Sequence, residues 1–298
     1  MNYGVVKTLP EHQPVMVSEV MSYLITDQNG IYVDGTVGLG EHSKTILSSL
    51  NQNGHLIGID RDDKALVVAE ENLARVSANF LLYNRSYTDT DLIIKEFGAQ
   101  TVNGILLDLG LSSAQLNDQN RGFTYNGDGA LDMRFNQQSG NTAEQILFYK
   151  TEAEIADFIR LYSEERYAKK IAYNIKRAEK MVTVDDLREA IRRSTPPNKR
   201  NRTFARVFQA IRIMVNDELN QLKIFLDNFI NFLCIGGRIV IISYHSLEDR
   251  LVKHALKKLK TENRISILTK KPLIATSSEI AKNSRSKSAK LRAGERIN

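Results

Sequence analysis

Residues 31–60 constrain the fold of this chain more than any other segment, because they read as a strand, a glycine-rich turn, a helix and a second strand. The apolar first strand, 31–35, leads into a turn in which Gly38 and Gly40 keep side chains away from a ligand. Asp60 closes the second strand about twenty residues past the turn, where a carboxylate can bind a ribose diol in nucleotide-binding folds. The pattern predicts a pocket for a nucleoside cofactor.

Two details of this turn argue against a dinucleotide. Its glycines are spaced G-x-x-G-x-G, whereas turns that bind a pyrophosphate read G-x-G-x-x-G. Asp34 ends the first strand, and a carboxylate there would repel a pyrophosphate but suit a cationic amino group. S-adenosylmethionine carries an ammonium, a sulfonium and a ribose but no phosphate, so the turn favours this cofactor. A tight strand–helix connection without a ligand is the structural alternative.

The basic residues are concentrated in two segments. The chain of 298 residues has a net charge of +6, to which residues 188–212 contribute +7 and residues 282–296 contribute +5. Such clustering is expected of a protein that binds a polyanion, because neutralising phosphates releases counterions. Together with a nucleoside cofactor, the clusters favour RNA or DNA as substrate. Solvated helix faces and a loose tail are the alternative.

The composition indicates a cytoplasmic protein. With 42% hydrophobic and 26% charged residues, the chain has no apolar run long enough to span a bilayer, and residues 1–10 lack the apolar core of a signal peptide. Cys234, the only cysteine, cannot form an internal disulfide or a cysteine metal site. We therefore expect a cytoplasmic location and no membrane contact.

Strand-like runs alternate with helical patterns along much of the chain. This alternation predicts the α/β class, with a Rossmann-like, doubly wound and mostly parallel sheet that has helices on both faces. Two later segments, 265–269 and 288–296, can supply further strands. The five principal runs are 31–35, 55–60, 79–83, 104–109 and 238–244.

A helical segment interrupts this alternation between the fourth and fifth strands. No convincing strand falls between about 113 and 206, where a polar, glycine-rich loop is followed by several helical patterns. We predict an all-helical substrate-recognition domain at 113–206, inserted into a cofactor-binding domain formed by 1–112 and 207–298. Because ligands bind at the carboxyl ends of parallel strands, an insertion after the fourth strand is well placed to bind the substrate.

Two strand ends supply candidate catalytic residues. Asp108 ends the fourth strand, and its carboxylate, or the carbonyl groups just after it, could accept a hydrogen bond from an exocyclic amino group that attacks a methyl carbon. A role limited to the loop or the cofactor is the alternative. His245 follows the fifth strand and could accept a proton or bind the base, with a structural hydrogen bond as the alternative. Ser246 and Asp249 fit a helix capping box, so capping does not require His245.

Short motifs near the start of the insertion are candidates for RNA contact. Arg121 and Arg134 could hold phosphate, and Phe123 could stack on a base. Residues 12–15, ahead of the first strand, could cover the pocket. A structural role is the alternative for each of them.

Motifs from both predicted domains resemble those of the MraW/RsmH family of bacterial 16S ribosomal RNA cytosine-N4 methyltransferases. The resemblance runs from about residue 11 to residue 296, and the runs 108–116 and 245–250 are together the most specific. In chain order the motifs are His12-Gln13-Pro14-Val15, Tyr32-Val33-Asp34-Gly35-Thr36, the run 108–116, Arg121-Gly122-Phe123, Leu131-Asp132-Met133-Arg134, Phe208-Gln209-Ala210-Ile211-Arg212, Val215-Asn216-Asp217-Glu218-Leu219, the run 245–250 and Ser288-Ala289-Lys290-Leu291-Arg292.

The resemblance implies a class I methyltransferase domain with an inserted helical domain, acting on a cytidine in the decoding region of the small-subunit RNA. Its implied cofactor is S-adenosyl-L-methionine, no metal is expected, and the implied partners are 16S rRNA and the small ribosomal subunit, with a homodimer left open. From the turn and the resemblance together, the expected cofactor-binding residues are Asp34, Gly38, Gly40, Glu41, His42, Asp60, Tyr87, Asp108 and Gln115. The residues expected to contact RNA are Arg121, Phe123, Arg134, Arg200, Arg202 and Arg250.

Three positions depart from the family pattern: Glu41, and also Ala130 and Ser284, the last two of which each replace a usual proline. Glu41 stands where the family usually has a second glycine after Gly40. The backbone N–H of Glu41 can still serve the cofactor, provided that the turn does not demand a positive φ at this position.

Two other functions are compatible with the sequence. One is an RNA-binding protein of ribosome assembly whose cofactor pocket is vestigial. The other is a methyltransferase that acts on DNA or protein. Transfer of a labelled methyl group to ribosomal RNA separates both from the function that the family resemblance implies.

Overall fold

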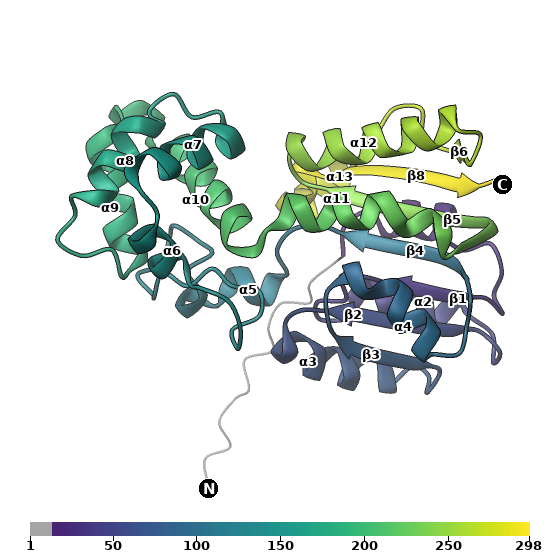
Figure 1. The fold of residues 1–298 in the computed structure, drawn as a ribbon. Coiled ribbons are helices and arrows are strands. Elements are labelled where there is room, and N and C mark those ends of the chain that lie inside the picture. Colours follow the sequence, from purple (N-terminus) through teal and green to yellow (C-terminus); the bar gives the residue numbers. More distant parts are fainter. Residues whose placement is uncertain (1–13) are drawn as a thin grey trace, which may run out of the picture. The chain divides into compact units, whose positions relative to one another are not determined.

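The chain forms two compact units, which the computed structural model describes over residues 14–298 (Figure 1). The first unit comprises the chain up to residue 110 and from residue 225, and the second comprises residues 111–224. His12 and Gln13, from the motif expected to cover the pocket, lie outside the described residues.

The first unit is built on one eight-stranded sheet. The strand order is β3-β2-β1-β4-β5-β8-β6, with β7 also paired to β8. The first five strands are parallel, and β8 runs antiparallel to its neighbours. The predicted α/β class with a mostly parallel sheet is confirmed. The strands are β1 (Ile31–Asp34), β2 (His55–Asp60), β3 (Phe80–Asn84), β4 (Val102–Asp108), β5 (Leu233–Ser243), β6 (Ile265–Ile267), β7 (Leu273–Ile274) and β8 (Lys290–Arg296).

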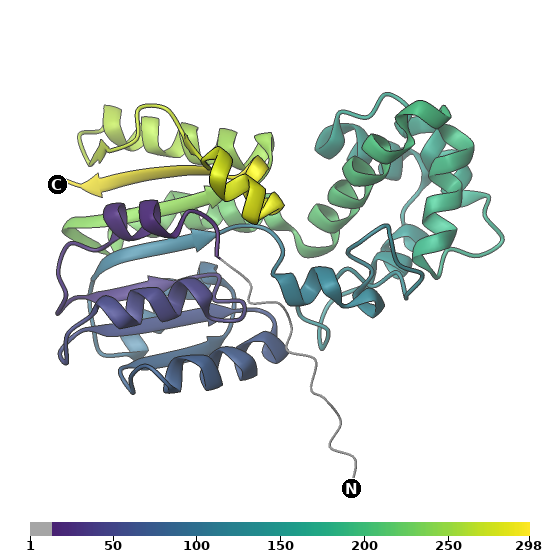
Figure 2. The same ribbon diagram turned by 180° about the vertical axis from the view of Figure 1, so that it is seen from behind.

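Helices cover both faces of this sheet. In Figure 1, α4 lies in front of the sheet, whereas α1 and α2 come to the front in Figure 2. Successive strand residues point to opposite faces, so Leu106 packs in a core with α1 and α2, while Ile105 and Leu107 point to the other face. The helices of this unit are α1 (Val17–Leu24), α2 (Glu41–Ser49), α3 (Asp63–Ala74), α4 (Thr90–Glu96), α12 (Ser246–Thr261) and α13 (Ser277–Lys282).

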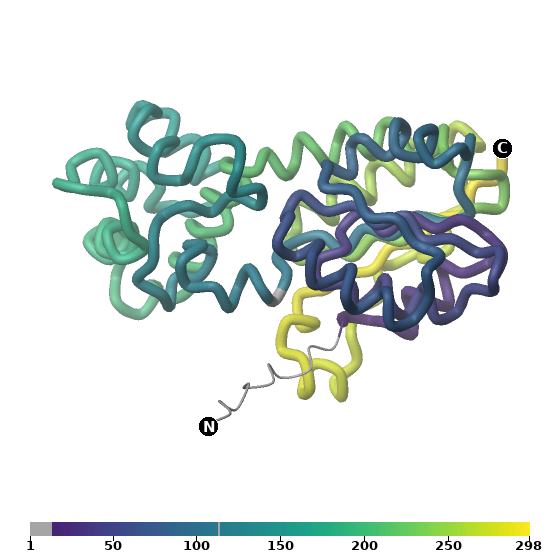
Figure 3. The backbone as a smooth tube through the Cα atoms, turned by 90° about the horizontal axis from the view of Figure 1, so that it is seen from below, coloured from purple at the N-terminus to yellow at the C-terminus, as the bar shows by residue number. Residues whose placement is uncertain are grey.

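The C-terminal segment returns to the beginning of α1. The backbone N–H of Met16 donates to Oε1 of Glu279 in α13 at 2.7 Å. Figure 3 accordingly draws the yellow C-terminal loop beside the purple start of the described chain. This contact fixes the segment that leads into β1.

The carboxyl ends of the parallel strands meet at one edge of the sheet. Asp34 ends β1, Asp60 ends β2 and Asp108 ends β4. Because these three strands are adjacent and run in the same direction, three carboxylates gather at this edge. Ligands of open parallel sheets bind outside this edge.

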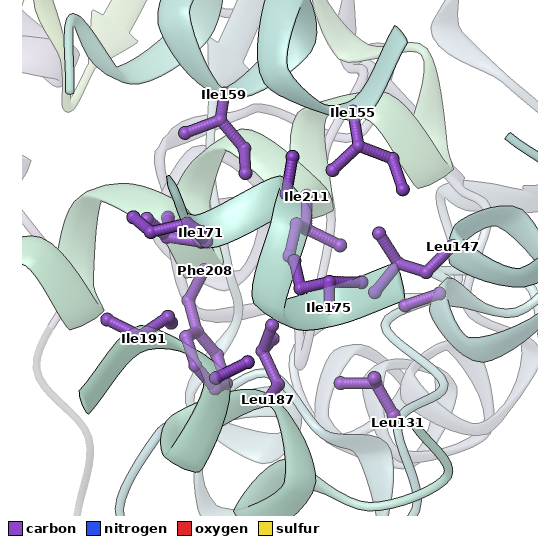
Figure 4. Packing of buried hydrophobic residues seen from close by; sticks show 14 of the residues in the cluster. Leu131, Leu147, Ile155, Ile159, Ile171, Ile175, Leu187, Ile191, Phe208 and Ile211 are labelled. Atoms are coloured by element: carbon purple, nitrogen blue, oxygen red, sulfur yellow. The ribbon is translucent and has the colours of Figure 1, made fainter. Parts of the chain in front are cut away.

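The second unit is helical, and in place of a strand its described backbone contains only an isolated bridge between Ala130 and Thr183. Figure 4 shows its apolar core, in which Ile155 and Ile159 of α7 face Ile211 of α10. The helices are α5 (Ser113–Asn117), α6 (Ala143–Tyr149), α7 (Glu152–Ser163), α8 (Ala168–Lys176), α9 (Val184–Ser194) and α10 (Arg200–Asn216).

The second boundary between the units falls later in the chain than the sequence suggested. The sequence pattern predicts that the cofactor-binding domain resumes at residue 207. The two compact units instead divide after residue 224, within α11 (Glu218–Asn228). Phe208 and Ile211 account for the difference, because both are buried in the core of the helical unit. An amphipathic pattern alone does not reveal which of two cores it faces.

Asn216, the last residue of α10, fastens a loop of the second unit. Its Nδ2 donates to the carbonyl oxygens of Met133 and Arg212 at 2.7 and 3.0 Å, and its Oδ1 accepts from the N–H of Phe135 at 2.7 Å. The residue is only 2% exposed. Met133 has a left-handed φ of 61°, so the loop is not regular secondary structure. Its buried backbone groups therefore take Asn216 as their hydrogen-bond partner.

Replacing Asn216 with Ala should lower the free energy of unfolding by about 2–4 kcal/mol, because buried backbone groups left without partners cost roughly 1–3 kcal/mol each. Urea unfolding of the variant and the unchanged protein measures the difference. Asn220→Ala is the matched control, since it removes an exposed side-chain bond to Asp217, and it should change stability by less than about 0.5 kcal/mol. Equal effects of the two substitutions would contradict the anchoring role.

Candidate active site

The glycine turn after β1 is tied to the end of β2. The N–H of Gly38 donates to Oδ2 of Asp60 at 2.7 Å, and the N–H of Gly40 donates to the carbonyl oxygen of Val37 at 2.8 Å. Gly38 and Gly40 have φ angles of 53° and 86°, in the left-handed region that favours glycine. A Cβ at Gly40 would also lie 3.3 Å from Ala69. The turn is therefore a backbone loop that larger residues would disturb.

Asp34 is buried at the base of this turn, with 1% of its surface exposed. Its Oδ2 accepts from Oγ of Ser43 at 2.6 Å, and its Oδ1 accepts from the N–H of Thr36 at 3.1 Å. Burial raises the pKa of Asp34 from 3.8 to about 6, although these hydrogen bonds lower it. The carboxylate is mostly ionised at neutral pH, where it attracts a cation and repels phosphate.

Asp60 accepts hydrogen bonds at both carboxylate oxygens. Besides the bond from Gly38, its Oδ1 accepts from the N–H of Asp62 at 2.9 Å. Burial raises the pKa of Asp60 to about 6 as well. Each carboxylate oxygen has two lone pairs, so Asp60 can accept from a sugar hydroxyl in addition to the backbone.

A carboxylate, a phenol and an imidazole from three elements meet beyond β4. Oδ1 of Asp108 accepts from Oη of Tyr244 at 2.8 Å, and Oδ2 lies 3.6 Å from Nε2 of His42. Burial, together with the negative charge of Asp108, raises the pKa of Tyr244 well above its usual value. The phenol therefore stays protonated and serves as the hydrogen-bond donor to Asp108. Burial also lowers the pKa of His42, so this ring is neutral at pH 7.

Glu41 does not require the conformational freedom of glycine. Gly40 adopts the left-handed conformation at the N-cap, and Glu41 is the first residue of α2 with an ordinary helical backbone. The turn therefore does not demand a positive φ at Glu41, which was the condition for its backbone N–H to serve the cofactor.

Tyr87 lies beside the strand end that carries Asp34. A Cβ added at Gly35, the residue after Asp34, would lie 3.0 Å from Cβ of Tyr87. The tyrosine ring packs edge-to-face against Phe225 with 5.6 Å between ring centroids. Tyr87 thus lies beside the first residue of the turn, and its contact with the cofactor stays a prediction.

His245 caps α12, which corrects one interpretation of the sequence. Its Nδ1 accepts from the N–H of Glu248 at 3.4 Å, and the Glu248 carboxylate accepts from the N–H of His245 at 3.2 Å. The capping box is His245 with Glu248, so the predicted box of Ser246 with Asp249 is wrong. Nε2 of His245 lies 3.1 Å from the same carboxylate without forming a hydrogen bond to it. Capping occupies Nδ1 of His245, whereas its Nε2 has no hydrogen-bond partner among the described residues.

Arginine and aromatic residues expected to contact RNA are held inside the second unit. Arg121 is 4% exposed and donates to the carbonyl oxygens of Arg134 and Phe135, both at 2.9 Å. Phe123 is part of the apolar core. Arg134 forms a bidentate pair with Asp132 at 2.7 and 2.9 Å. These contacts give both motifs a structural role.

Gln115 also belongs to the second unit. It closes the capping box of α5, where its N–H donates to Oγ of Ser112 at 3.2 Å and its Oε1 accepts from the N–H of Ser112 at 3.1 Å. Its expected contact with the cofactor stays a prediction.

Ion pairs neutralise much of the two basic segments. Salt bridges join Arg188 to Asp185 and Asp128, Arg192 and Arg193 to Glu189, Arg212 to Glu218, and Lys290 and Arg292 to Asp249. Most of these carboxylates lie outside the segments, so the net charges counted from the sequence overstate what the segments present to a ligand. Arg202 and Arg250 are exposed, whereas Arg200 is half-buried and donates to the carbonyl oxygen of Thr195 at 3.4 Å.

Sequence reasoning missed three residues that position the carboxylates. Ser43 donates to Asp34, Tyr244 donates to Asp108, and Oγ1 of Thr36 accepts from the N–H of Asp108 at 2.6 Å. Two of these bonds span 72 and 136 positions in the sequence, so no local pattern reveals them. Only the parallel order of the strands brings the partners together.

Comparison with known proteins assigns the chain to a family. A model of the MraW methylase family matches residues 10–297. The chain belongs to this family. It is a methyltransferase, and its methyl donor is S-adenosylmethionine.

Its relatives resemble it over nearly their whole length. Proteins named ribosomal RNA small subunit methyltransferase H from Kosmotoga olearia and Thermosipho africanus are each 44% identical to the chain over 96% of its length, covering 97% and 98% of their own. Among solved structures, an rRNA methylase from Streptococcus thermophilus is 10% identical, with a TM-score of 0.45, over 95% of this chain and 94% of that one. Among residues 14–298, no helix is long and apolar enough to cross a lipid bilayer.

The strand-end residues of this MraW-family chain fit such a donor. His42 is 7% exposed, and its Nε2 has no hydrogen-bond partner among the described residues. A buried nitrogen of this kind requires an explanation, and a bound ligand provides one. The neighbouring Asp34 suits a cationic amino acid group, and Asp60 suits a ribose.

The pKa of Asp34 predicts how an Asn substitution depends on pH. Between about pH 4 and pH 6 the folded protein keeps a proton that the unfolded chain has lost, so the contribution of Asp34 to stability falls as the pH rises through this window. Asp34→Asn removes this dependence while its amide can still bond Thr36 and Ser43. The unfolding free energy of the variant, relative to the unchanged protein, should therefore rise from pH 4 to about pH 6 and then level off.

Urea unfolding at a series of pH values provides the measurement. Asp157→Asn, at a side chain that is 76% exposed, is the control and should show little pH dependence relative to the unchanged protein. A pH-independent difference for Asp34→Asn would mean that burial does not raise the pKa of Asp34.

Proposed function

We propose that the protein transfers the methyl group of S-adenosylmethionine to the N4 amino group of a cytidine in the 16S rRNA of the small ribosomal subunit. The observation that carries the proposal is the Asp108 carboxylate, which ends β4 beside the candidate donor site with one oxygen bonded to Tyr244. Relatives named for small-subunit ribosomal RNA support the substrate class. Runs 108–116 and 245–250 carry the resemblance to cytosine-N4 enzymes. Since ribosomal subunits are cytoplasmic, we place the activity there.

Strand-end and turn residues would hold the donor. Asp34 would accept hydrogen bonds from its ammonium group, and Asp60 would bind the ribose hydroxyls. The backbone from Gly38 to His42 would line the donor, with Nε2 of His42 gaining a partner. Tyr87 and Gln115 complete the proposed set, along with Asp108. When bound, S-adenosylmethionine supplies a methyl group that carries the positive character of the sulfonium.

Asp108 would act on the acceptor nitrogen. The N4 lone pair of cytosine is delocalised into the base, and a carboxylate that accepts an N–H hydrogen bond increases the electron density on the nitrogen. As the new N–C bond forms, the bond between sulfur and the methyl group would break and leave its electron pair on the neutral thioether. The nitrogen then becomes acidic and would release one proton, which the same carboxylate can accept. Tyr244 positions Asp108 by donating a hydrogen bond to it.

Exposed basic residues would hold the RNA outside this site. We propose that Arg202 and Arg250 contact phosphates, with the half-buried Arg200 as a weaker contributor. The target cytidine would leave its stack to reach the methyl group. His245 would order the loop after β5 through its capping role.

Methyl transfer to small subunits tests the proposal. The protein is incubated with methyl-labelled S-adenosylmethionine and subunits from a strain that lacks the modifying enzyme, and the RNA is then digested to nucleosides. We expect the label in N4-methylcytidine. Label in DNA or protein but not in RNA would assign another substrate, and bound RNA without label would favour a binding protein with a vestigial pocket.

Two substitutions separate the roles of Asp108 and Tyr244. With saturating donor, Asp108→Asn should lower kcat by about 10²–10⁴-fold, the range of a general acid–base group. Tyr244→Phe should lower kcat by roughly tenfold, as expected for loss of one hydrogen bond. Tyr173→Phe, at an exposed ring, is the matched control and should leave kcat unchanged. An unchanged kcat for Asp108→Asn would remove Asp108 from the reaction.

A further inference from the structure

A stripe of basic residues runs along the exposed side of α12. Arg250, Lys253, Lys257 and Lys260 are all exposed, and they are three, four and three positions apart. This spacing places them on one side of the helix. At 1.5 Å per residue the stripe is about 15 Å long. We name these four residues the α12 basic stripe.

Within the described part of the chain, no salt bridge neutralises the α12 basic stripe. Residues 250–260 contain five Lys or Arg residues and no Asp or Glu. The acidic residues of the helix are engaged elsewhere, because Glu248 closes the capping box and Asp249 pairs with Lys290 and Arg292. The stripe thus differs from residues 188–212, where several arginines have carboxylate partners.

Helix stability does not explain this arrangement. Like charges three and four positions apart repel each other and destabilise a helix. The helix dipole favours basic residues only in the last turn, whereas Arg250 and Lys253 lie in the first half of α12. A surface that keeps such a charge pattern is explained by an anionic ligand.

We infer that the α12 basic stripe binds the sugar–phosphate backbone of the RNA substrate, an inference that rests on the proposed function. Lysine and arginine side chains donate to phosphate oxygens and release counterions on binding. Contacts of this kind to phosphate position the RNA without reading its sequence.

An anionic membrane fits this surface less well than RNA does. Helices that lie on membranes insert an apolar side into the lipid. The apolar side of α12, formed by Val252, Leu256 and Leu259, is buried, and the helix packs against β6 and β8. Only the charged side of α12 is available to a ligand.

The triple variant K253Q/K257Q/K260Q tests the inference in the full-length protein. Binding of small-subunit RNA is measured at a series of salt concentrations, and log K is plotted against log salt concentration. Each lost phosphate contact reduces the slope by about 0.7–0.9, so the variant should lower the slope by roughly 2–3. With methyl transfer as the readout, KM for RNA should rise while kcat at saturating RNA stays the same.

A matched control distinguishes a local contact from net charge. K95Q/K223Q/K271Q removes three exposed lysines that lie outside α12 and outside the predicted substrate-recognition segment 113–206, and it should leave the slope unchanged. An unchanged slope for the α12 variant, or equal changes in both variants, would overturn the inference. Binding to anionic phospholipid vesicles that depends on the stripe, with no change in the RNA slope, would overturn it in favour of a membrane.

The label-transfer assay keeps this inference separate from the proposed function. If the unchanged protein methylates the RNA but the α12 variant keeps its salt slope, only the inference fails. If the unchanged protein transfers no label, the proposed function fails, and the salt slope still decides whether the stripe contacts phosphate.

Discussion

Parallel pairing of β1 with β2 on one side and with β4 on the other brings Asp34, Asp60 and Asp108 to one edge of the sheet. Burying carboxylates there is costly, and the pKa of both Asp34 and Asp60 rises to about 6 as a result. Hydrogen bonds from Ser43 and from the N–H of Gly38 offset part of that cost. The edge is thus a preorganised, negatively charged surface that a cationic donor would stabilise and a pyrophosphate would not.

The fold and the glycine turn after β1 were predictable because their signals are local. Apolar runs mark the strands, and the glycine spacing with Asp34 marks the turn within a few residues. Tyr244 could not be found in this way, because its bond to Asp108 spans 136 positions. His245 was misread for a related reason. A histidine is an uncommon cap, and only the coordinates distinguish its bond to Glu248 from the more usual pair of Ser246 with Asp249.

Charge counts from the sequence were a poor guide to binding surfaces. Residues 188–212 have the larger count, but Arg188 and Arg212 are neutralised by carboxylates outside that segment. Arg121 and Phe123 likewise read as RNA contacts and are instead buried. The α12 basic stripe has a smaller count than residues 188–212 but retains its charge, since its neighbours provide no carboxylate. Exposure and pairing therefore determine which basic residues can meet phosphate.

The most direct test of the donor site is a calorimetric comparison of S-adenosylmethionine and NADH binding to the unchanged protein and to Asp34→Asn at pH 8. We predict that the unchanged protein binds S-adenosylmethionine and not NADH. Asp34→Asn should weaken S-adenosylmethionine binding at least about tenfold, because it removes a charge-assisted hydrogen bond. Equal S-adenosylmethionine affinity in both proteins, or NADH binding as tight as that of S-adenosylmethionine, would contradict the selection of a cationic donor by this carboxylate.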